Sequence, residues 1–138
     1  MTPTTTLLPH PAPTCPNARL ALFAIRRMGA HGLADAAAAH GIFTTFGQRF
    51  RRPLVLLRTF MAELASTAQG TIAIAPCCCP RMTPAEQILL RILGRIHDAP
   101  DSAHLLMADL LGVRRVEAVL MAAAAVAAAF ADEGRPIG

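Results

Sequence analysis

The sequence predicts an all-α protein, an irregular bundle of about six helices in a single domain, and three observations support this prediction. Prolines stand where helices would begin and glycines where they would end, which is the usual asymmetry of helix boundaries. Apolar residues recur at helical spacing. Residues 71–76 alternate like a strand, but no second strand is evident to pair with them. We therefore expect that segment to be an extended connector between helices.

Length and composition agree with one small domain. A chain of 138 residues is long enough for one hydrophobic core. Much of the hydrophobic fraction of 54% is Ala, and the chain has only six Phe and no Trp or Tyr. The net charge of +4 comes from arginine without lysine, which we attribute to the base composition of the gene rather than to anion binding. The core is expected to consist of small residues and closely packed backbones.

The N-terminal segment is expected to lie outside the helical domain. Residues 1–14 are rich in Pro and Thr, which predicts a disordered or loosely attached arm, and the helical domain is expected over residues 15–138. The arm has neither the basic nor the apolar region of a signal peptide. The longest apolar run, residues 118–131, is shorter than the ~20 residues that a membrane span needs. We expect a cytoplasmic protein without a membrane partner.

The first half of the domain should contain three helices. The first begins at Pro16 and ends at Gly29 or Gly32, and we expect its three arginines to form a polar stripe on an otherwise buried helix. These arginines are Arg19, Arg26 and Arg27. The second begins near Leu33, and Gly41 should weaken it or end it early. The third has the clearest helical periodicity, with apolar residues at Leu54, Leu57, Met61 and Leu64. Pro53 marks its start and Gly70 its end.

Three more helices are expected after the connector. Thr83, Pro84 and Glu86 match a capping box with proline at the first helical position. A fifth helix should end at Gly112. The sixth should run from about Arg114 to near Gly134 as a mostly buried, alanine-rich helix.

Several blocks of the chain resemble a known family. They are CPNARLALFAIRRMGAHGLADA, APCCCPRMT, ADLLGV and AVAAAFADEGRP. The chain is similar over nearly its whole length to a family of small bacterial proteins classed as a domain of unknown function. The resemblance implies no activity, cofactor or catalytic residue.

The most unusual motif is a run of three cysteines between two prolines. In an extended segment, Cys77 and Cys79 would point to one side and Cys78 to the other. Cys15 is the only other cysteine, and it also precedes a proline and an expected helix start. Helix N-termini carry partial positive charge and favour the thiolate form. We expect Cys15 and the run to converge on one site.

These thiols predict a metal or cofactor site or a redox-sensing thiol pair. The alternatives left open are an iron–sulfur cluster, copper(I), haem held by a Cys-Pro thiolate, and zinc with an added histidine. The candidate ligands are Cys15, Cys77, Cys78, Cys79, His31 and His40. The paired spacing of a zinc finger is absent. A bond between Cys77 and Cys78 would be strained, because neighbouring Cα atoms are only ~3.8 Å apart.

Three other functions are weighed against the thiol site. We expect a homodimer, because an alanine-rich helix allows a second copy to approach closely, and a cofactor-free homodimeric interaction protein is the main alternative to the thiol site. Residues 105–120 resemble a helix-turn-helix, but the second helix lacks the polar residues that read DNA, so nucleic acid is not expected as a partner. Enzymatic activity is the weaker hypothesis, because the acids are scattered. A nucleophile and base formed by Cys78 and His31 would be the catalytic alternative.

Overall fold

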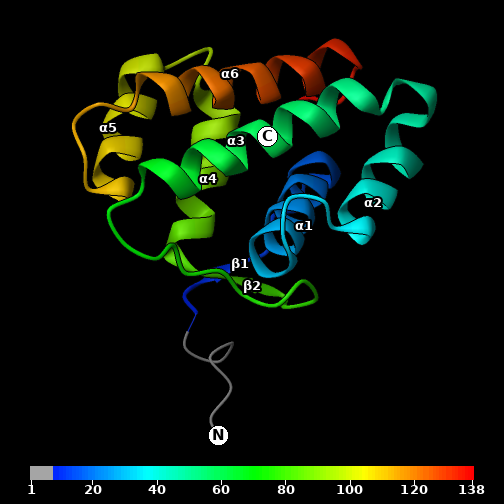
Figure 1. Cartoon of the computed structure of the whole chain (residues 1–138), viewed down its shortest axis with the longest axis horizontal. Coiled ribbons are helices and arrows are strands. Elements are labelled where there is room, and N and C mark those ends of the chain that lie inside the picture. Colours follow the sequence, from blue (N-terminus) through cyan, green and yellow to red (C-terminus); the bar gives the residue numbers. More distant parts are fainter. Residues whose placement is uncertain (1–7) are drawn as a thin grey trace, which may run out of the picture.

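The computed structural model describes residues 8–138, and within them the fold is mostly α-helical, as the sequence predicts (Figure 1). Its elements, in chain order, are β1 (His10–Pro11), α1 (Pro16–His31), α2 (Ala36–Phe46), the 3₁₀-helix η2 (Gly47–Arg49), α3 (Arg51–Thr67), β2 (Arg81–Met82), α4 (Pro84–Arg95), α5 (Pro100–Leu111) and α6 (Glu117–Asp132). The two strands form one short antiparallel pair. The prediction of an all-α bundle of about six helices is confirmed.

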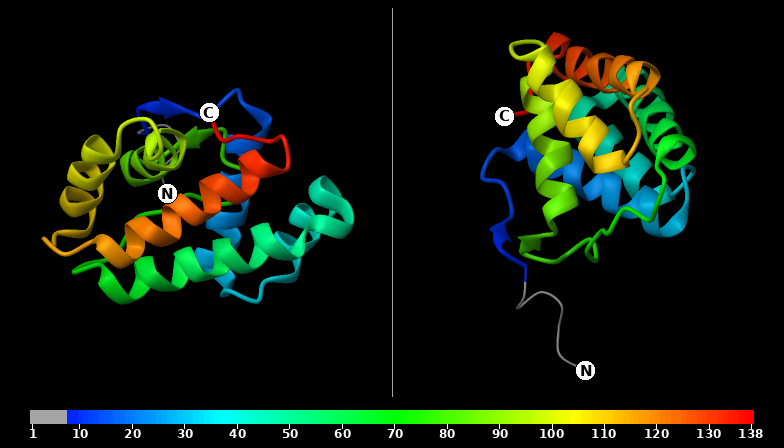
Figure 2. Two further views of the ribbon diagram at one scale, coloured as in Figure 1. Left: turned by 90° about the horizontal axis from the view of Figure 1, so that it is seen from above. Right: turned by 90° about the vertical axis from the view of Figure 1, so that its left-hand side faces the viewer.

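The helices are arranged around α3 and α6, which lie side by side (Figure 2). They run in opposite directions, since Arg52 at the start of α3 pairs with Asp132 at the end of α6, with nitrogen and oxygen 2.8 Å apart. Helix α1 lies beneath them, α4 runs upright behind α3 from the level of β2 to that of α6, and α2 and α5 lie at opposite ends of the molecule (Figures 1 and 2). The core fills the space between these layers.

Small residues allow α6 to pack closely on its neighbours. Its buried face includes Ala123, Val126, Ala127 and Phe130, and Phe130 meets the ring of Phe46 edge-on with centroids 5.0 Å apart. The rest of this alanine-rich helix remains partly exposed. No helix within residues 8–138 is long and apolar enough to cross a membrane.

Two helices begin later than the sequence predicts. Helix α2 starts at Ala36, because the carboxylate of Asp35 accepts a hydrogen bond from the backbone N–H of Ala38 at 2.9 Å and caps the helix. Gly41 does not end α2. Helix α6 starts at Glu117 because Gly112 takes a left-handed conformation, with φ of 71°, and ends α5 ahead of a short turn.

The described part of the N-terminal arm is attached to the domain. His10 pairs with Met82 across the two-stranded ladder, and the N–H of Ala12 donates to the carbonyl of Pro80 at 2.9 Å. The Arg81 guanidinium donates to the carbonyl of Pro9 at 2.9 Å. The arm was expected over residues 1–14, and residues 1–7 lie outside the described part. Residues 8–14 therefore run alongside the segment that follows the cysteines.

Ala123 on α6 is fully buried against the core, so we predict that a larger side chain does not fit at this position. Replacing Ala123 with leucine should lower the free energy of unfolding by about 1–3 kcal/mol, because the added atoms have no space between the helices. Urea denaturation would measure the loss. Ala118→Leu, at an exposed position of the same helix, is the matched control and should change stability little. Equal effects of the two substitutions would contradict the close packing.

Candidate functional site

The three consecutive cysteines form a tight turn rather than an extended strand. The N–H of Cys79 donates to the carbonyl of Pro76 at 3.0 Å, which places Cys77 and Cys78 at the tip. The sulfurs of Cys77 and Cys78 lie 3.4 Å apart, whereas Cys79 is buried. The expected extended conformation, with Cys78 on the side opposite Cys77 and Cys79, is wrong, because the turn abolishes the alternation and all three cysteines line one hollow. The site is a pair of adjacent thiols near the surface.

A buried ion pair anchors the turn to α1. The Arg26 guanidinium donates to both carboxylate oxygens of Glu86 at 2.7 and 3.0 Å, and the two side chains are 2% and 0% exposed. The same guanidinium donates to the carbonyls of Cys79 and Arg81 at 2.9 and 2.8 Å. Arg26 therefore binds the chain on both sides of Pro80 and holds the cysteine turn against α1.

The carboxylate of Glu86 is saturated by backbone groups as well. It accepts hydrogen bonds from the N–H of Ala75 at 3.0 Å and from the N–H of Thr83 at 2.9 Å. In return, the hydroxyl oxygen of Thr83 accepts from the N–H of Glu86 at 3.1 Å, which completes the capping box. The hydroxyl also donates to the carbonyl of Ala73 at 2.8 Å. The predicted capping box is confirmed, and it fixes both ends of the loop that carries the cysteines.

Arg26 is the functional residue whose role sequence analysis missed. It was expected in a polar stripe with Arg19 and Arg27, but its side chain is buried and only Arg19 is exposed. The sequence does indicate that Arg26 lies on an apolar face of the helix, because Leu22 and Ala30, four residues to either side, are apolar. An arginine on an apolar face requires a buried acid as partner.

A second arginine lies beside the thiols. Arg27 donates to both carboxylate oxygens of Asp35 at 3.0 and 2.9 Å, and this raises the pKa of the guanidinium and lowers the pKa of the carboxyl. The Cys77 thiol also raises the pKa of Arg27, to a smaller extent. Arg27, His31 and Cys77 line the same small hollow between the end of α1 and the loop. Cys77 thus lies beside a guanidinium whose positive charge is partly balanced by Asp35.

The surroundings of Cys78 raise the pKa of its thiol. The hydrogen bond to Cys77, followed by the negative charge of a Cys77 thiolate and by burial, raises the pKa of Cys78. Arg27 and Arg26 oppose this effect. A raised pKa favours the protonated form of Cys78, which suits it as the hydrogen-bond donor of the pair.

Cys15 and His40 lie apart from the cysteine turn. Cys15 lines a different hollow, next to the start of α1, where its sulfur is 3.9 Å from the carbonyl oxygen of Pro136. The N–H of Ala18 lowers the pKa of Cys15, as expected at a helix N-terminus. His40 is exposed on α2 beside Thr44. Of the expected histidines, only His31 shares a hollow with one of the three consecutive cysteines.

Within residues 8–138, the side chains do not form a complete metal centre. In the part of the chain that the structure describes, no three His, Cys, Asp or Glu side chains are grouped so that they could hold a metal ion. Tetrahedral zinc and iron–sulfur clusters require about four ligands. The pair of sulfurs at the tip therefore fits thiol chemistry or a two-coordinate soft ion better than either of these centres.

The chain belongs to a family of unknown function (DUF6628), whose pattern it matches over residues 2–123. The family resemblance drawn from the sequence blocks is confirmed, and the match includes all four cysteines together with Arg26 and Glu86. Comparison with curated proteins and with solved structures finds no match. Membership in this family therefore assigns no activity or cofactor to the site.

The buried ion pair predicts a large loss of stability when one partner is removed. Arg26→Met should lower the free energy of unfolding by about 3–5 kcal/mol, because the Glu86 carboxylate stays buried without its countercharge. It should also expose Cys79 to alkylation, since the turn loses an anchor. Arg52→Met, which removes the exposed pair with Asp132, is the control and should cost below about 1 kcal/mol. Losses of similar size in urea denaturation would contradict the anchoring role.

The opposite pKa shifts of Cys15 and Cys78 predict different pH dependences. Only the thiolate is alkylated, so the alkylation rate of each cysteine follows its pKa. The alkylation rate of Cys15 should rise at a pH below the ordinary thiol pKa of about 8.5, and that of Cys78 should rise at a pH above this value. Mass spectrometry after short iodoacetamide pulses would measure both rates in one sample. In Cys77→Ser the rise for Cys78 should move to lower pH, because the negative neighbour is gone. Identical profiles for Cys15 and Cys78 would contradict these assignments.

Proposed function

We propose that the protein is a cytoplasmic redox sensor whose reactive group is the thiolate of Cys77. The observation that carries the proposal is the contact between the sulfurs of Cys77 and Cys78, 3.4 Å apart at the tip of an anchored turn. Arg27 supplies positive charge beside Cys77, and Cys78 supplies a proton. A thiolate with a cationic neighbour and access to solvent is the usual environment of a redox-sensing cysteine. The reducing conditions of the cytosol would keep both thiols free.

The proposed reaction is oxidation of Cys77 by a peroxide. The thiolate attacks one peroxide oxygen, the O–O bond breaks, and a sulfenic acid forms on Cys77. The leaving hydroxide takes the proton of Cys78 and becomes water. Sulfur loses two electrons and the peroxide gains them. A bond between the adjacent sulfurs would be strained, so we expect the sulfenic acid to persist or to condense with a small thiol such as glutathione, releasing water.

Copper(I) is the metal alternative that the pair of sulfurs supports best. Thiolates favour this soft ion over harder ones, and two adjacent sulfurs could hold it with two ligands. Zinc, an iron–sulfur cluster and haem find less support, because Cys15 and His40 lie away from the turn. Elemental analysis of protein purified without oxygen distinguishes copper(I) from a free thiol pair.

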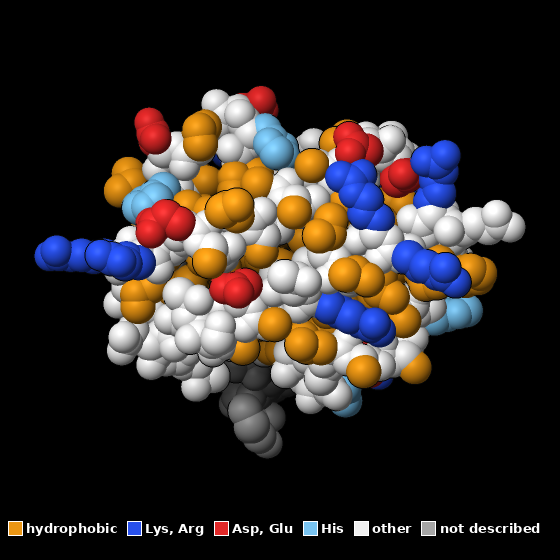
Figure 3. Space-filling model, turned by 45° about the horizontal axis from the view of Figure 1, so that its top comes forward, with side chains coloured by type: hydrophobic (Ala, Val, Ile, Leu, Met, Phe, Trp, Pro, Cys, Tyr) orange, Lys and Arg blue, Asp and Glu red, His pale blue; other side chains and the backbone are white. Residues whose placement is uncertain are grey.

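A cofactor-free homodimer is the alternative outside thiol chemistry. Met121 on α6 and Val55 on the adjacent α3 are 73% and 55% exposed. Figure 3 shows apolar side chains across one face of the molecule, between polar and backbone atoms. A second copy would cover such side chains. Sedimentation velocity tests this alternative directly.

Nucleic acid is not expected as a partner. Helix α6 presents Ala118 and Met121 outward rather than side chains that read bases. Two arginines near the end of this helix are already paired with acids, Arg49 with Glu133 and Arg52 with Asp132. On the face in Figure 3, red and blue side chains lie next to each other, which weakens attraction to phosphate.

Peroxide treatment tests the sensor. After brief exposure to hydrogen peroxide, dimedone should label Cys77, because dimedone reacts with sulfenic acids. Cys77→Ser should abolish the label, and Cys78→Ser should slow its formation severalfold, because the proton donor is lost. Cys15→Ser is the matched control and should leave labelling of Cys77 unchanged. Mass spectrometry of the peptides would locate the label.

Two results would contradict the sensor. One is labelling of Cys15 or Cys78 in preference to Cys77. The other is stoichiometric copper in anaerobically purified protein that is lost in Cys77→Ser and Cys78→Ser alike.

A further inference from the structure

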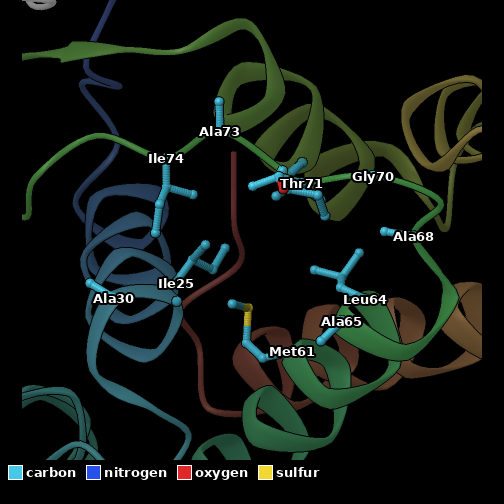
Figure 4. Close-up of a pocket in the computed structure, with 13 residues that line it drawn as sticks. Ile25, Ala30, Met61, Leu64, Ala65, Ala68, Gly70, Thr71, Ala73 and Ile74 are labelled. Atoms are coloured by element: carbon cyan, nitrogen blue, oxygen red, sulfur yellow. The ribbon is translucent and has the colours of Figure 1, made fainter.

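We propose that a cavity between α1, α3, α4 and the connector binds an uncharged aliphatic small molecule. The cavity has a volume of about 610 Å³, within the roughly 300–1,000 Å³ of typical small-molecule sites. Figure 4 shows Ile25, Leu64 and Ile74 reaching toward its interior from different walls. None of the four cysteines lines it. The proposal is therefore independent of the redox function.

The lining specifies the chemistry of the ligand. The wall carries no Asp, Glu, Arg or His side chain, and the hydroxyl of Thr71 is its one polar side-chain group. A charged ligand would lose its hydration without gaining a countercharge. An alkyl or acyl chain would bury apolar surface against Ile25, Met61 and Leu64, which is favourable in proportion to the area covered.

Small residues keep the cavity from being filled by the protein itself. Ala65 on α3, Ala68 directly after it and Ala30 on α1 line it, where larger side chains would occupy the space (Figure 4). Gly29 lets Ile74 approach α1, since a Cβ at this position would lie 2.6 Å from the Cδ1 atom of Ile74. Small residues in the lining of the cavity thus leave its volume open.

The connector offers polar groups at one wall for the end of such a ligand. The N–H of Gln69 donates to Leu111, and the N–H of Ala75 donates to Glu86. Between these two residues, the backbone N–H groups donate no hydrogen bond to residues 8–138. A ligand hydroxyl or carbonyl oxygen that reaches one of these groups would replace a bound water. A neutral alcohol, ester or amide with an aliphatic chain combines both features.

Fluorescence of N-phenyl-1-naphthylamine, an uncharged apolar probe, tests the site in the full chain. The probe should bind, and 1-decanol should displace it at least tenfold better than decanoate at pH 8, because the wall has no cation. Ala65→Phe should weaken probe binding at least tenfold by filling the cavity. Ala62→Phe, at an exposed position of α3 that does not line the cavity, should change binding less than twofold. Both substitutions are at exposed positions, and thermal unfolding would verify the fold.

The expected results differ from those of the sensor experiments, since Cys77→Ser should leave probe binding unchanged. The proposal is overturned if the probe does not bind, if both phenylalanine variants bind equally, or if decanoate competes as well as 1-decanol. It is also overturned if sedimentation velocity finds a dimer that Ala65→Phe dissociates, because a second copy would then occupy the cavity.

Discussion

The ion pair between Arg26 and Glu86 is the interaction on which the site depends. Removing two charges from water is costly, and a buried pair is tolerated only when its remaining hydrogen-bonding groups are satisfied. Here the carboxylate accepts four hydrogen bonds, two from Arg26 and two from backbone N–H groups, and the guanidinium also binds two carbonyls. One charged pair therefore ties α1, the start of α4 and the loop between residues 75 and 83 into one unit.

This anchoring explains how an irregular loop can present reactive groups in a fixed geometry. The loop has no ladder of its own before β2, and without Arg26 its carbonyls at Cys79 and Arg81 would lack their partner on α1. Because the anchor holds Cys79 inside, Cys77 and Cys78 are left at the tip. The ion pair thereby separates one structural cysteine from two accessible ones.

The connector that leads into this loop forms a wall of the aliphatic cavity, so the two proposed sites are neighbours. Ala30 and Ile74 line both the cavity and the small hollow that contains Cys77 and His31. The connector enters the ion-pair network at Ala73 and Ala75. Its position relative to α1 is therefore determined by Glu86 and Thr83 as well as by apolar contacts. A small stretch of irregular chain serves as the boundary of both sites.

The sequence by itself determined what depends on local interactions. Helix class, the boundaries at Pro16 and Gly112, and the capping box at Thr83 follow from hydrogen bonds and backbone preferences within a few residues. The run of cysteines was also recognisable as a candidate site. Its turn was not, because an extended segment and a turn have similar local preferences here, and the choice depends on the anchor.

Only the tertiary structure decided which side chains meet. Arg26 and Glu86 are 60 residues apart, and each has a sufficient local explanation, as a surface arginine and as a capping residue. Cys15 and the cysteine turn have the same local signature before a helix, yet they line different hollows. The reason is that packing of α1 against α4 and the loop fixes these distances, and no local pattern encodes the relative position of two helices.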